Sequence, residues 1–310
     1  MKILGAWSGH DCSYCILEDG HPVVHAEYER HIREKEPAGD GLQFFFDDCE
    51  DVDDIKYFVT SHSFEKTLAH KESFNRISQI VEKNKGGIHV FGHHQCHAAN
   101  AFFSSNLDES LIITMDGGGV EDKNGFVSAF TVWQGKGNKI HPLSIFPLNE
   151  IDIGGVWTRV TRYVYQMQSG WPYGHQAGTI MAMAAFGDSS KYVDDFYRML
   201  TTDLQYAHVR APGQPRGAVI PGKDPKHPYL HRWTEIASRG EQEKFDLAAG
   251  LQLATEIYMK ELFGAILKKV GNVKNICFSG GVALNSVAMG KVKGWFPELE
   301  EIYVTPTPHD

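Results

Sequence analysis

The segment LIITMDGGG, residues 111–119, begins a pattern of elements that the chain has already shown once. Its first five residues are apolar or β-branched and predict a buried strand, and the glycines that follow predict a turn. Two further strand candidates, at 126–134 and 140–146, are joined by a short turn rich in glycine. This part of the chain is therefore predicted to form a three-stranded meander.

The same order of elements opens the chain. Three strands are predicted there, with the tight turn Glu18-Asp19-Gly20 between the second and the third. A further strand, a helix and a short strand follow them. These six elements are expected at residues 2–7, 13–17, 22–29, 55–60, 65–82 and 88–91.

After the second meander the chain is mainly helical. The clearest helix covers residues 243–269, where apolar residues recur every three or four positions. Residues 208–233 contain five prolines without sustained periodicity and are predicted to form a loop-rich surface insertion. The other expected elements are helices at 156–167, 176–186 and 192–200, a strand at 276–278, a helix ending near 293, and a strand at 302–304.

The tandem meanders, each followed by helices and strands, predict a duplicated α/β fold with a cleft between its two copies. We expect the first lobe at residues 1–109 and the second at residues 110–310.

The composition argues against several classes of protein. The 310 residues have a formal net charge of −9, which is the wrong sign for general binding to nucleic acid backbones. The five cysteines are scattered and make no disulfide framework. No run approaches the roughly 20 apolar residues of a membrane span, and the first strand is too short for a signal-peptide core. These features predict a cytoplasmic protein that does not enter a membrane.

A histidine cluster precedes the small apolar run that begins at Ala98. If this segment is helical, His93 and His97 are four positions apart and project from one face, as in a two-histidine metal clamp. Asp116, at the exit of a predicted strand, is the candidate third ligand. The alternative is that the histidines cap a helix and that Asp116 belongs to a turn. Fe²⁺ or Zn²⁺ is the expected ion.

Two glycine runs follow strands and predict phosphate contacts. Gly117, Gly118 and Gly119 come after Asp116, and residues 279–285 contain Gly280, Gly281 and Asn285 before a helix. Each run alone is more typical of a simple turn. Because there are two such loops in a duplicated α/β fold, we expect an adenine nucleotide in the cleft.

His10 follows the first strand and precedes Asp11. An imidazole here is a candidate general base for an attacking hydroxyl, and the alternative is a His-Asp pair that only caps a turn.

In this order, the motifs resemble the O-carbamoyltransferases of nodulation-factor and antibiotic tailoring. The resemblance rests on Gly9-His10-Asp11, the His-His-x-x-His-Ala stretch at 93–98, the Asp-Gly-Gly-Gly run at 116–119, and residues 181–187, 280–285 and 306–310. It implies a duplicated actin-like fold (ASKHA, ribonuclease H-like) related to the threonylcarbamoyl-transferring tRNA-modification proteins, with an ATP-derived nucleotide and a metal, usually iron, in the cleft.

The resemblance also implies roles for single residues. His93, His97, Asp116 and Asp310 match the metal ligands, Asn285 and its neighbouring glycines match the nucleotide loop, and His10 matches the histidine near the acceptor hydroxyl. Two features depart from the family. Thr179 stands where a lysine is usual, and the chain stops at Asp310, where the family continues into a closing element and a domain that makes carbamoyladenylate.

The expected activity is therefore ATP-dependent O-carbamoyl transfer, from carbamoyladenylate made from carbamoyl phosphate and ATP, to a hydroxyl of a small-molecule or sugar-like acceptor. The isolated chain is expected to be inactive with carbamoyl phosphate. Two alternatives stay open: an ASKHA phosphotransferase acting directly with ATP, and a truncated, non-catalytic nucleotide-binding subunit that requires a partner chain. A homodimer is also left open.

Overall fold

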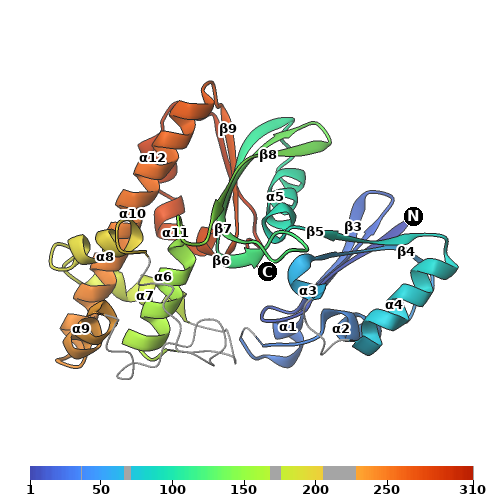
Figure 1. Ribbon diagram of the computed structural model, residues 1–310, viewed down its shortest axis with the longest axis horizontal. Coiled ribbons are helices and arrows are strands. Elements are labelled where there is room, and N and C mark those ends of the chain that lie inside the picture. Colours follow the sequence, from blue (N-terminus) through green and yellow to red (C-terminus); the bar gives the residue numbers. More distant parts are fainter. Residues whose placement is uncertain (36, 66–70, 168–175, 205–227, 310) are drawn as a thin grey trace.

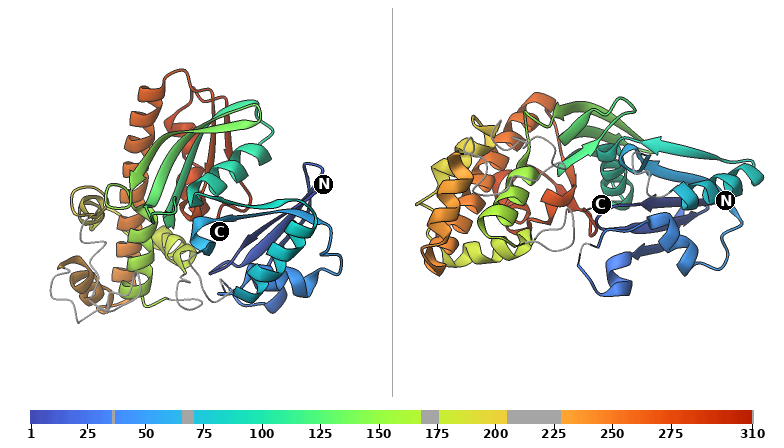
Figure 2. Two further views of the ribbon diagram at one scale, coloured as in Figure 1. Left: turned by 45° about the vertical axis from the view of Figure 1, so that its right-hand side comes forward. Right: turned by 60° about the horizontal axis from the view of Figure 1, so that its bottom comes forward.

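The computed structural model describes residues 1–35, 37–65, 71–167, 176–204 and 228–309, and it contains two five-stranded sheets. The two sheets lie in separate halves of the molecule (Figure 1). The N-terminus lies at the outer end of the first sheet, whereas the C-terminal end lies between the two halves (Figure 2).

The first sheet has the strand order β3-β2-β1-β4-β5. Strands β1, β2 and β3 pair antiparallel as the predicted meander, and β4 and β5 add in parallel to β1. The strands are β1 (Lys2–Trp7), β2 (Ser13–Glu18), β3 (His21–Glu27), β4 (Ile55–Ser61) and β5 (Gly87–Phe91).

The second sheet repeats this topology. Its order is β10-β9-β6-β7-β8, with an antiparallel meander β6-β7-β8 and the parallel strands β9 and β10 on the other side of β6. The strands are β6 (Glu109–Val120), β7 (Val127–Lys136), β8 (Lys139–Pro147), β9 (Asn275–Ser279) and β10 (Glu301–Val304). The match between the sheets confirms the predicted duplicated α/β fold.

The helices of the first half are short. Helices α2 and α4 bury apolar side chains such as Phe45 and Ile77 in the core of the first sheet. The helices of this half are α1 (Tyr28–Ile32), α2 (Gly41–Asp48), α3 (His62–Glu65) and α4 (Lys71–Lys83).

Helix α5 (His93–Ser104) follows β5 but packs against β6, β7 and β9 of the second sheet. Its Ala98, Ala101 and Phe102 form a small core with Ile112, Trp133 and Cys277. Although α5 falls within the stretch 1–109 expected for the first lobe, its contacts join it to the second sheet. We propose that the second lobe begins before α5.

The second sheet carries the larger helical layer. Helix α10 (Glu241–Val270) covers it, and Leu247, Leu251 and Phe263 are fully buried. The remaining elements are α6 (Ile153–Arg159), the π-helical turn η2 (Val160–Val164), α7 (Ala177–Met183), η3 (Ala184–Phe186), α8 (Val193–Leu200), α9 (Pro228–Ala237), η5 (Gly281–Leu284), α11 (Ser286–Met289) and α12 (Val292–Trp295). Among the described helices, none combines the length and apolarity that a membrane span needs.

Several local predictions differ from the structure. The sequence analysis did not predict α2, and β6 extends through Asp116 to Val120 instead of ending at Met115. Helix α9 begins at Pro228, so the last residues of the expected irregular insertion are helical and Trp233 is fully buried. The earlier residues of that insertion, 208–227, lie outside the described residues.

Candidate metal and nucleotide site

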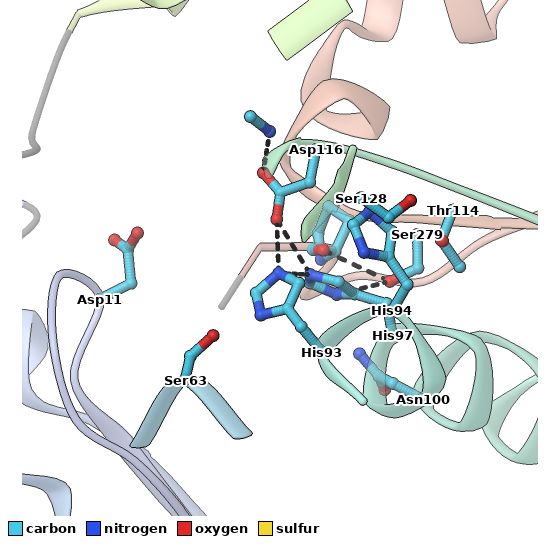
Figure 3. A network of polar contacts seen from close by, with 12 residues as sticks. Asp11, Ser63, His93, His94, His97, Asn100, Thr114, Asp116, Ser128 and Ser279 are labelled. Atoms are coloured by element: carbon cyan, nitrogen blue, oxygen red, sulfur yellow. Dashed lines mark hydrogen bonds and ion pairs between the residues drawn. The ribbon is translucent and has the colours of Figure 1, made fainter. Parts of the chain in front are cut away.

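Helix α5 and strand β6 bring together the side chains of His93, His97 and Asp116 (Figure 3). The Nε2 atoms of His93 and His97 lie 2.9 Å and 3.1 Å from Asp116 Oδ2, and 3.1 Å from each other. The helical spacing aligns the two imidazoles, and α5 packs on the strand that carries the carboxylate. The structure therefore assembles three of the predicted metal ligands.

The three side chains form a buried set of nitrogen and oxygen donors. His93 and His97 are 4% and 5% exposed, and Asp116 is partly buried. Burial acts to raise the pKa of Asp116, but the hydrogen bonds and positive charge from the two histidines outweigh it and hold that pKa well below its usual value. Two imidazoles and a carboxylate suit Zn²⁺ and Fe²⁺, and tetrahedral bonds of about 2.1 Å would separate the donor atoms by about 3.4 Å. The donor types fit such an ion, and the donor atoms would move apart by a few tenths of an ångström to hold it.

Gly119 makes room for one of these ligands. A Cβ atom built on Gly119 would lie 2.0 Å from Cγ of His93, so only glycine fits beside the imidazole. The sequence analysis assigned this glycine to phosphate binding. Its observed contact is with the histidine, and the phosphate role stays a prediction.

The other two glycines of this run lie in an irregular part of β6, where its pairing with β7 shifts between Met115 and Gly119. The Gly117 N–H donates to Asp116 Oδ1 at 2.6 Å, and Gly118 has a φ of 120°. Both glycines are exposed. Because the Gly117 amide is already bound, the run is not an open ring of free amides.

The second glycine loop lies against Asp116, one of the predicted metal ligands. A Cβ on Gly281 would lie 3.1 Å from Asp116 Oδ1, and one on Gly280 would lie 2.1 Å from the Met115 carbonyl oxygen. Gly280 has a φ of 90°, and its N–H donates to the Pro308 carbonyl at 2.7 Å. The loop is thereby held against the end of β6, as a shared site requires.

Asn285 has mainly structural partners. It is 9% exposed, and its side chain exchanges hydrogen bonds with Gln252 at 2.9 Å and 3.1 Å. Its Oδ1 also caps α11 by accepting from Ala288 N–H. The predicted nucleotide contact of Asn285 is thus untested, and its observed contacts fix the loop.

His10 and Asp11 lie in the first half, in the turn after β1. Asp11 accepts a hydrogen bond from His10 Nδ1 at 2.8 Å, and the imidazole is half-exposed. Asp11 has a φ of 55°, an uncommon conformation for a residue other than glycine. Its carboxylate lies across from Asp116 (Figure 3).

Trp7 connects this turn with the histidines. Its indole N–H donates to the His10 carbonyl at 2.7 Å, and its ring meets the His93 ring edge-on at a centroid distance of 5.7 Å. Trp7 was assigned only to a strand in the sequence analysis. No sequence signal marked it, because the contact joins residues 86 positions apart.

Two further residues contact the histidines of α5. Ser279 Oγ lies 3.4 Å from His97 Nδ1, on the ring nitrogen that faces away from Asp116. Glu121 accepts from His94 Nδ1 at 2.7 Å, and burial lowers the pKa of His94. The position of Ser279 at the end of β9, directly before two glycines, was the available signal. Asp310, the fourth predicted ligand, lies outside the described residues.

Comparison with known proteins places these features in context. A family model described as the carbamoyltransferase N-terminus matches residues 50–310. Nodulation protein NolNO of Sinorhizobium fredii is 25% identical over 97% of this chain and 44% of its own length. Nodulation protein NolO of Bradyrhizobium diazoefficiens is 28% identical over 70% of this chain and 36% of its own length. The chain therefore spans less than half of these relatives.

Solved structures resemble the chain along its whole length. Full-length HypF in its phosphate- and nucleotide-bound form has a TM-score of 0.52 and 12% identity, covering 99% of this chain and 44% of HypF. Component A of (R)-2-hydroxyglutaryl-CoA dehydratase from Acidaminococcus fermentans has a TM-score of 0.51 and 14% identity, covering 99% of this chain and 92% of that protein. These similarities confirm the predicted two-lobed, actin-like (ASKHA) fold.

Proposed function

The chain belongs to the family of carbamoyltransferase N-terminal domains, and we propose that it transfers the carbamoyl group of carbamoyladenylate to a hydroxyl of a small-molecule or sugar-like acceptor. The observation that carries this proposal is the placement of the His93, His97 and Asp116 donors across from the His10-Asp11 turn. A transferase of this kind needs a group that stabilises negative charge and a base that removes the acceptor proton.

His10 is proposed as the base. Because Asp11 accepts from Nδ1–H of His10, the imidazole is held in the tautomer whose Nε2 can take a proton. The acceptor oxygen would form a bond to the carbamoyl carbon while its proton moves to this Nε2. The bond from that carbon to the phosphate oxygen then breaks, and AMP leaves with the electron pair.

His93, His97 and Asp116 are proposed to hold Fe²⁺ or Zn²⁺, with Asp310 as a further ligand. Such an ion supplies Lewis-acid stabilisation of the charge that develops on phosphate oxygens. Gly119 leaves space for the His93 ring, and Ser279 meets the second nitrogen of His97, so the chain itself orients the two imidazoles.

The nucleotide is proposed to lie beside the Gly280-Gly281 loop, since Gly281 adjoins Asp116. Carbamoyladenylate is proposed to form from carbamoyl phosphate and ATP in a further domain or a partner chain. This part of the proposal rests on the relatives, of which the chain covers 44% or less. We further propose that the protein acts in the cytoplasm.

The test is product formation, followed by mass spectrometry, with a panel of hydroxyl acceptors and each donor in turn. We expect an O-carbamate and AMP from supplied carbamoyladenylate, and no product from carbamoyl phosphate plus ATP. His10→Ala should abolish transfer, whereas His21→Ala, a change at an exposed histidine of β3, should not affect it.

Three other results would contradict the proposal. Phosphorylated acceptor formed from ATP would identify a phosphotransferase. Nucleotide binding without any transfer would indicate a non-catalytic subunit. Turnover from carbamoyl phosphate plus ATP by this chain alone would place the activating chemistry within the two lobes.

A further inference from the structure

Arg159, the last residue of α6, is a largely buried cation with few partners. Its side chain is 15% exposed, and its Nη1 lies 3.4 Å from Oδ2 of Asp152. Within the described part of the chain, its buried Nε has no hydrogen-bond partner. A guanidinium carries five N–H donors, and a buried one is normally paired on most of them. Within the described residues, Arg159 therefore has N–H donors that could bind a ligand.

The position of α6 places this group at the wall of the candidate site. The helix packs against β6 and η5, the elements that carry Asp116 and Gly281. A Cβ on Gly154, in the first turn of α6, would lie 2.5 Å from the Asp116 carbonyl carbon. The first turn of α6 thus touches the backbone of a predicted metal ligand.

The guanidinium lies over this same first turn. Side chains on a helix lean toward its N-terminus, and a Cβ on Gly155 would lie 2.5 Å from Nη1 of Arg159 and 2.0 Å from Oδ2 of Asp152. Glycine at 155 is therefore what allows the arginine to reach back along the helix. The long side chain brings its charge from the end of α6 back to its first turn, and Gly154 of that turn touches the Asp116 backbone.

A purely structural ion pair does not account for this arrangement. Asp152 is 1% exposed, and its Oδ1 accepts from the Gly155 N–H at 2.6 Å. Its Oδ2 lies 3.4 Å from Nη1 of Arg159, which is a long distance for an ion pair. A structural arginine–carboxylate pair is commonly bidentate, with N–O distances of about 2.7–2.9 Å. Here the contact with the carboxylate uses only Nη1 of the guanidinium, through one long hydrogen bond.

The local charges also call for a cation. Asp116 and Asp152 bring two carboxylates to this wall, and either would repel an anionic ligand.

In addition, Arg159 directly precedes η2, where the Tyr165 N–H donates to the Val160 carbonyl at 3.2 Å across a π-helical turn. Such turns are frequent at functional sites.

We infer that Arg159 binds an anionic group of a ligand, phosphate or carboxylate, beside Asp116, with Asp152 and Gly155 setting its position. The inference deepens the proposed function and rests on it for the site, but it concerns recognition and not the transfer step. Phosphate would belong to the nucleotide and carboxylate to the acceptor. Both offer two acceptor oxygens that the planar guanidinium can bind with two parallel N–H donors.

The experiment is calorimetric titration of the full chain with inorganic pyrophosphate, AMP, adenosine and malonate. The test variant is Asp152→Asn/Arg159→Gln, which removes both buried charges and avoids leaving a carboxylate unpaired. The control is Arg239→Gln, at an exposed arginine that pairs with Glu235. Circular dichroism establishes that each variant is folded.

We expect the double variant to bind pyrophosphate and AMP about tenfold or more weakly, with adenosine and the control unchanged. A selective loss of malonate affinity would instead assign the group to a carboxylate. Equal affinities of wild type and double variant for all probes, or no binding of any anion by the wild type, would overturn the inference. If the double variant does not fold, Arg159→Lys carries the same test, since lysine keeps the charge but not the fork of donors.

Failure here is distinguishable from failure of the proposed function. Pyrophosphate, AMP and malonate that all bind equally well with and without Arg159 would remove the anion role and leave carbamoyl transfer untouched. Anion binding that depends on Arg159, in a protein that makes no carbamate, would leave the anion role standing.

Discussion

The two sheets share one topology but differ in what the ends of their strands carry. In the first sheet, β1 leads to the half-exposed His10-Asp11 turn, and β4 leads to a short helix. In the second sheet, the corresponding strand β6 carries the buried Asp116, and β9 leads to Ser279 and the tightly held glycine loop. Duplication thus supplies two facing edges, while the donors and glycine contacts are concentrated on one of them.

The difference follows from the helices. Helix α5 leaves the first sheet yet packs on the second, so its histidines reach Asp116. The first edge carries the half-exposed His10, and the second carries the buried His93 and His97. Ligands of open α/β sheets bind at such strand ends, and the following predictions test this division.

The largest effect is expected from the ligands of the second edge. His93→Ala/His97→Ala should reduce bound Fe²⁺ or Zn²⁺ from about one ion per chain to background, since it removes two of three donors. Elemental analysis of the purified proteins measures this, with His21→Ala as control. Undiminished metal in the double variant would place the ion elsewhere.

Two glycines of β6, Gly117 and Gly119, allow a more specific test of metal binding at this site. Gly119→Ala should also lose metal, because its Cβ would occupy the place of the His93 ring, whereas Gly117→Ala meets no atom closer than 3.8 Å and should retain it. Similar metal content in both variants would show that the fit of His93 against β6 is not required.

Two glycines with nearly equal backbone angles compare the two halves directly. Gly20, in the β2–β3 turn, has a φ of 87° with open space around it, whereas Gly280 has a φ of 90° and faces the Met115 carbonyl oxygen. Gly20→Ala should lower the free energy of unfolding by about 1–2 kcal/mol, and Gly280→Ala by about 3 kcal/mol or more. Urea unfolding measures the free energy of unfolding of each variant. Equal losses in the two variants would contradict the close packing of Gly280 against Met115.

The third prediction concerns pH. Burial raises the pKa of Asp152 to about 6 in the folded chain, against an unfolded value of about 3.9. A raised folded pKa stabilises the fold below the unfolded pKa, and this contribution is lost as the pH rises through about 6, by about 2–3 kcal/mol in total.

Asp152→Asn should remove this dependence. We expect the difference in free energy of unfolding between wild type and variant to change across that pH range, as measured by urea titration of metal-free protein. Parallel curves for the two proteins would mean that Arg159 keeps the carboxylate ionised at all these pH values.

The smallest effect is expected at the nucleotide loop. Gly281→Val places a branched side chain against Asp116 Oδ1 and should weaken AMP or ATP binding about tenfold, because phosphate needs close approach to the backbone. Gly294→Val, at a position with open space, is the matched control. Calorimetric titration measures the affinities, and equal values for wild type and Gly281→Val would show that the loop is only a turn.

Patterns local in sequence gave most of the fold and the metal ligands. The i, i+4 histidines and an aspartate on a buried strand are visible without coordinates, and so was the duplicated meander. Helix α2 was not predicted because its run Phe44-Phe45-Phe46 is as typical of a strand, and the Asp40 side chain that caps it, accepting from Leu42 N–H, is a weak signal.

The contacts that depend on long-range packing were not predictable. That Gly119 serves His93 follows from how α5 lies on β6, and the Arg159–Asp152 pair depends on a glycine between them in α6. The residue types were visible in the sequence, but their partners were set by the tertiary fold.

The edge-on contact between Trp7 and His93 gives the molecule an intrinsic optical reporter. An indole whose centroid lies 5.7 Å from that of a proposed ligand ring is close enough for a paramagnetic ion held there to quench its fluorescence. The same indole is tied to the His10 carbonyl in the other half. In a variant that keeps Trp7 and replaces the other five tryptophans, its emission would therefore report both the loading of the metal site and the separation of the two halves.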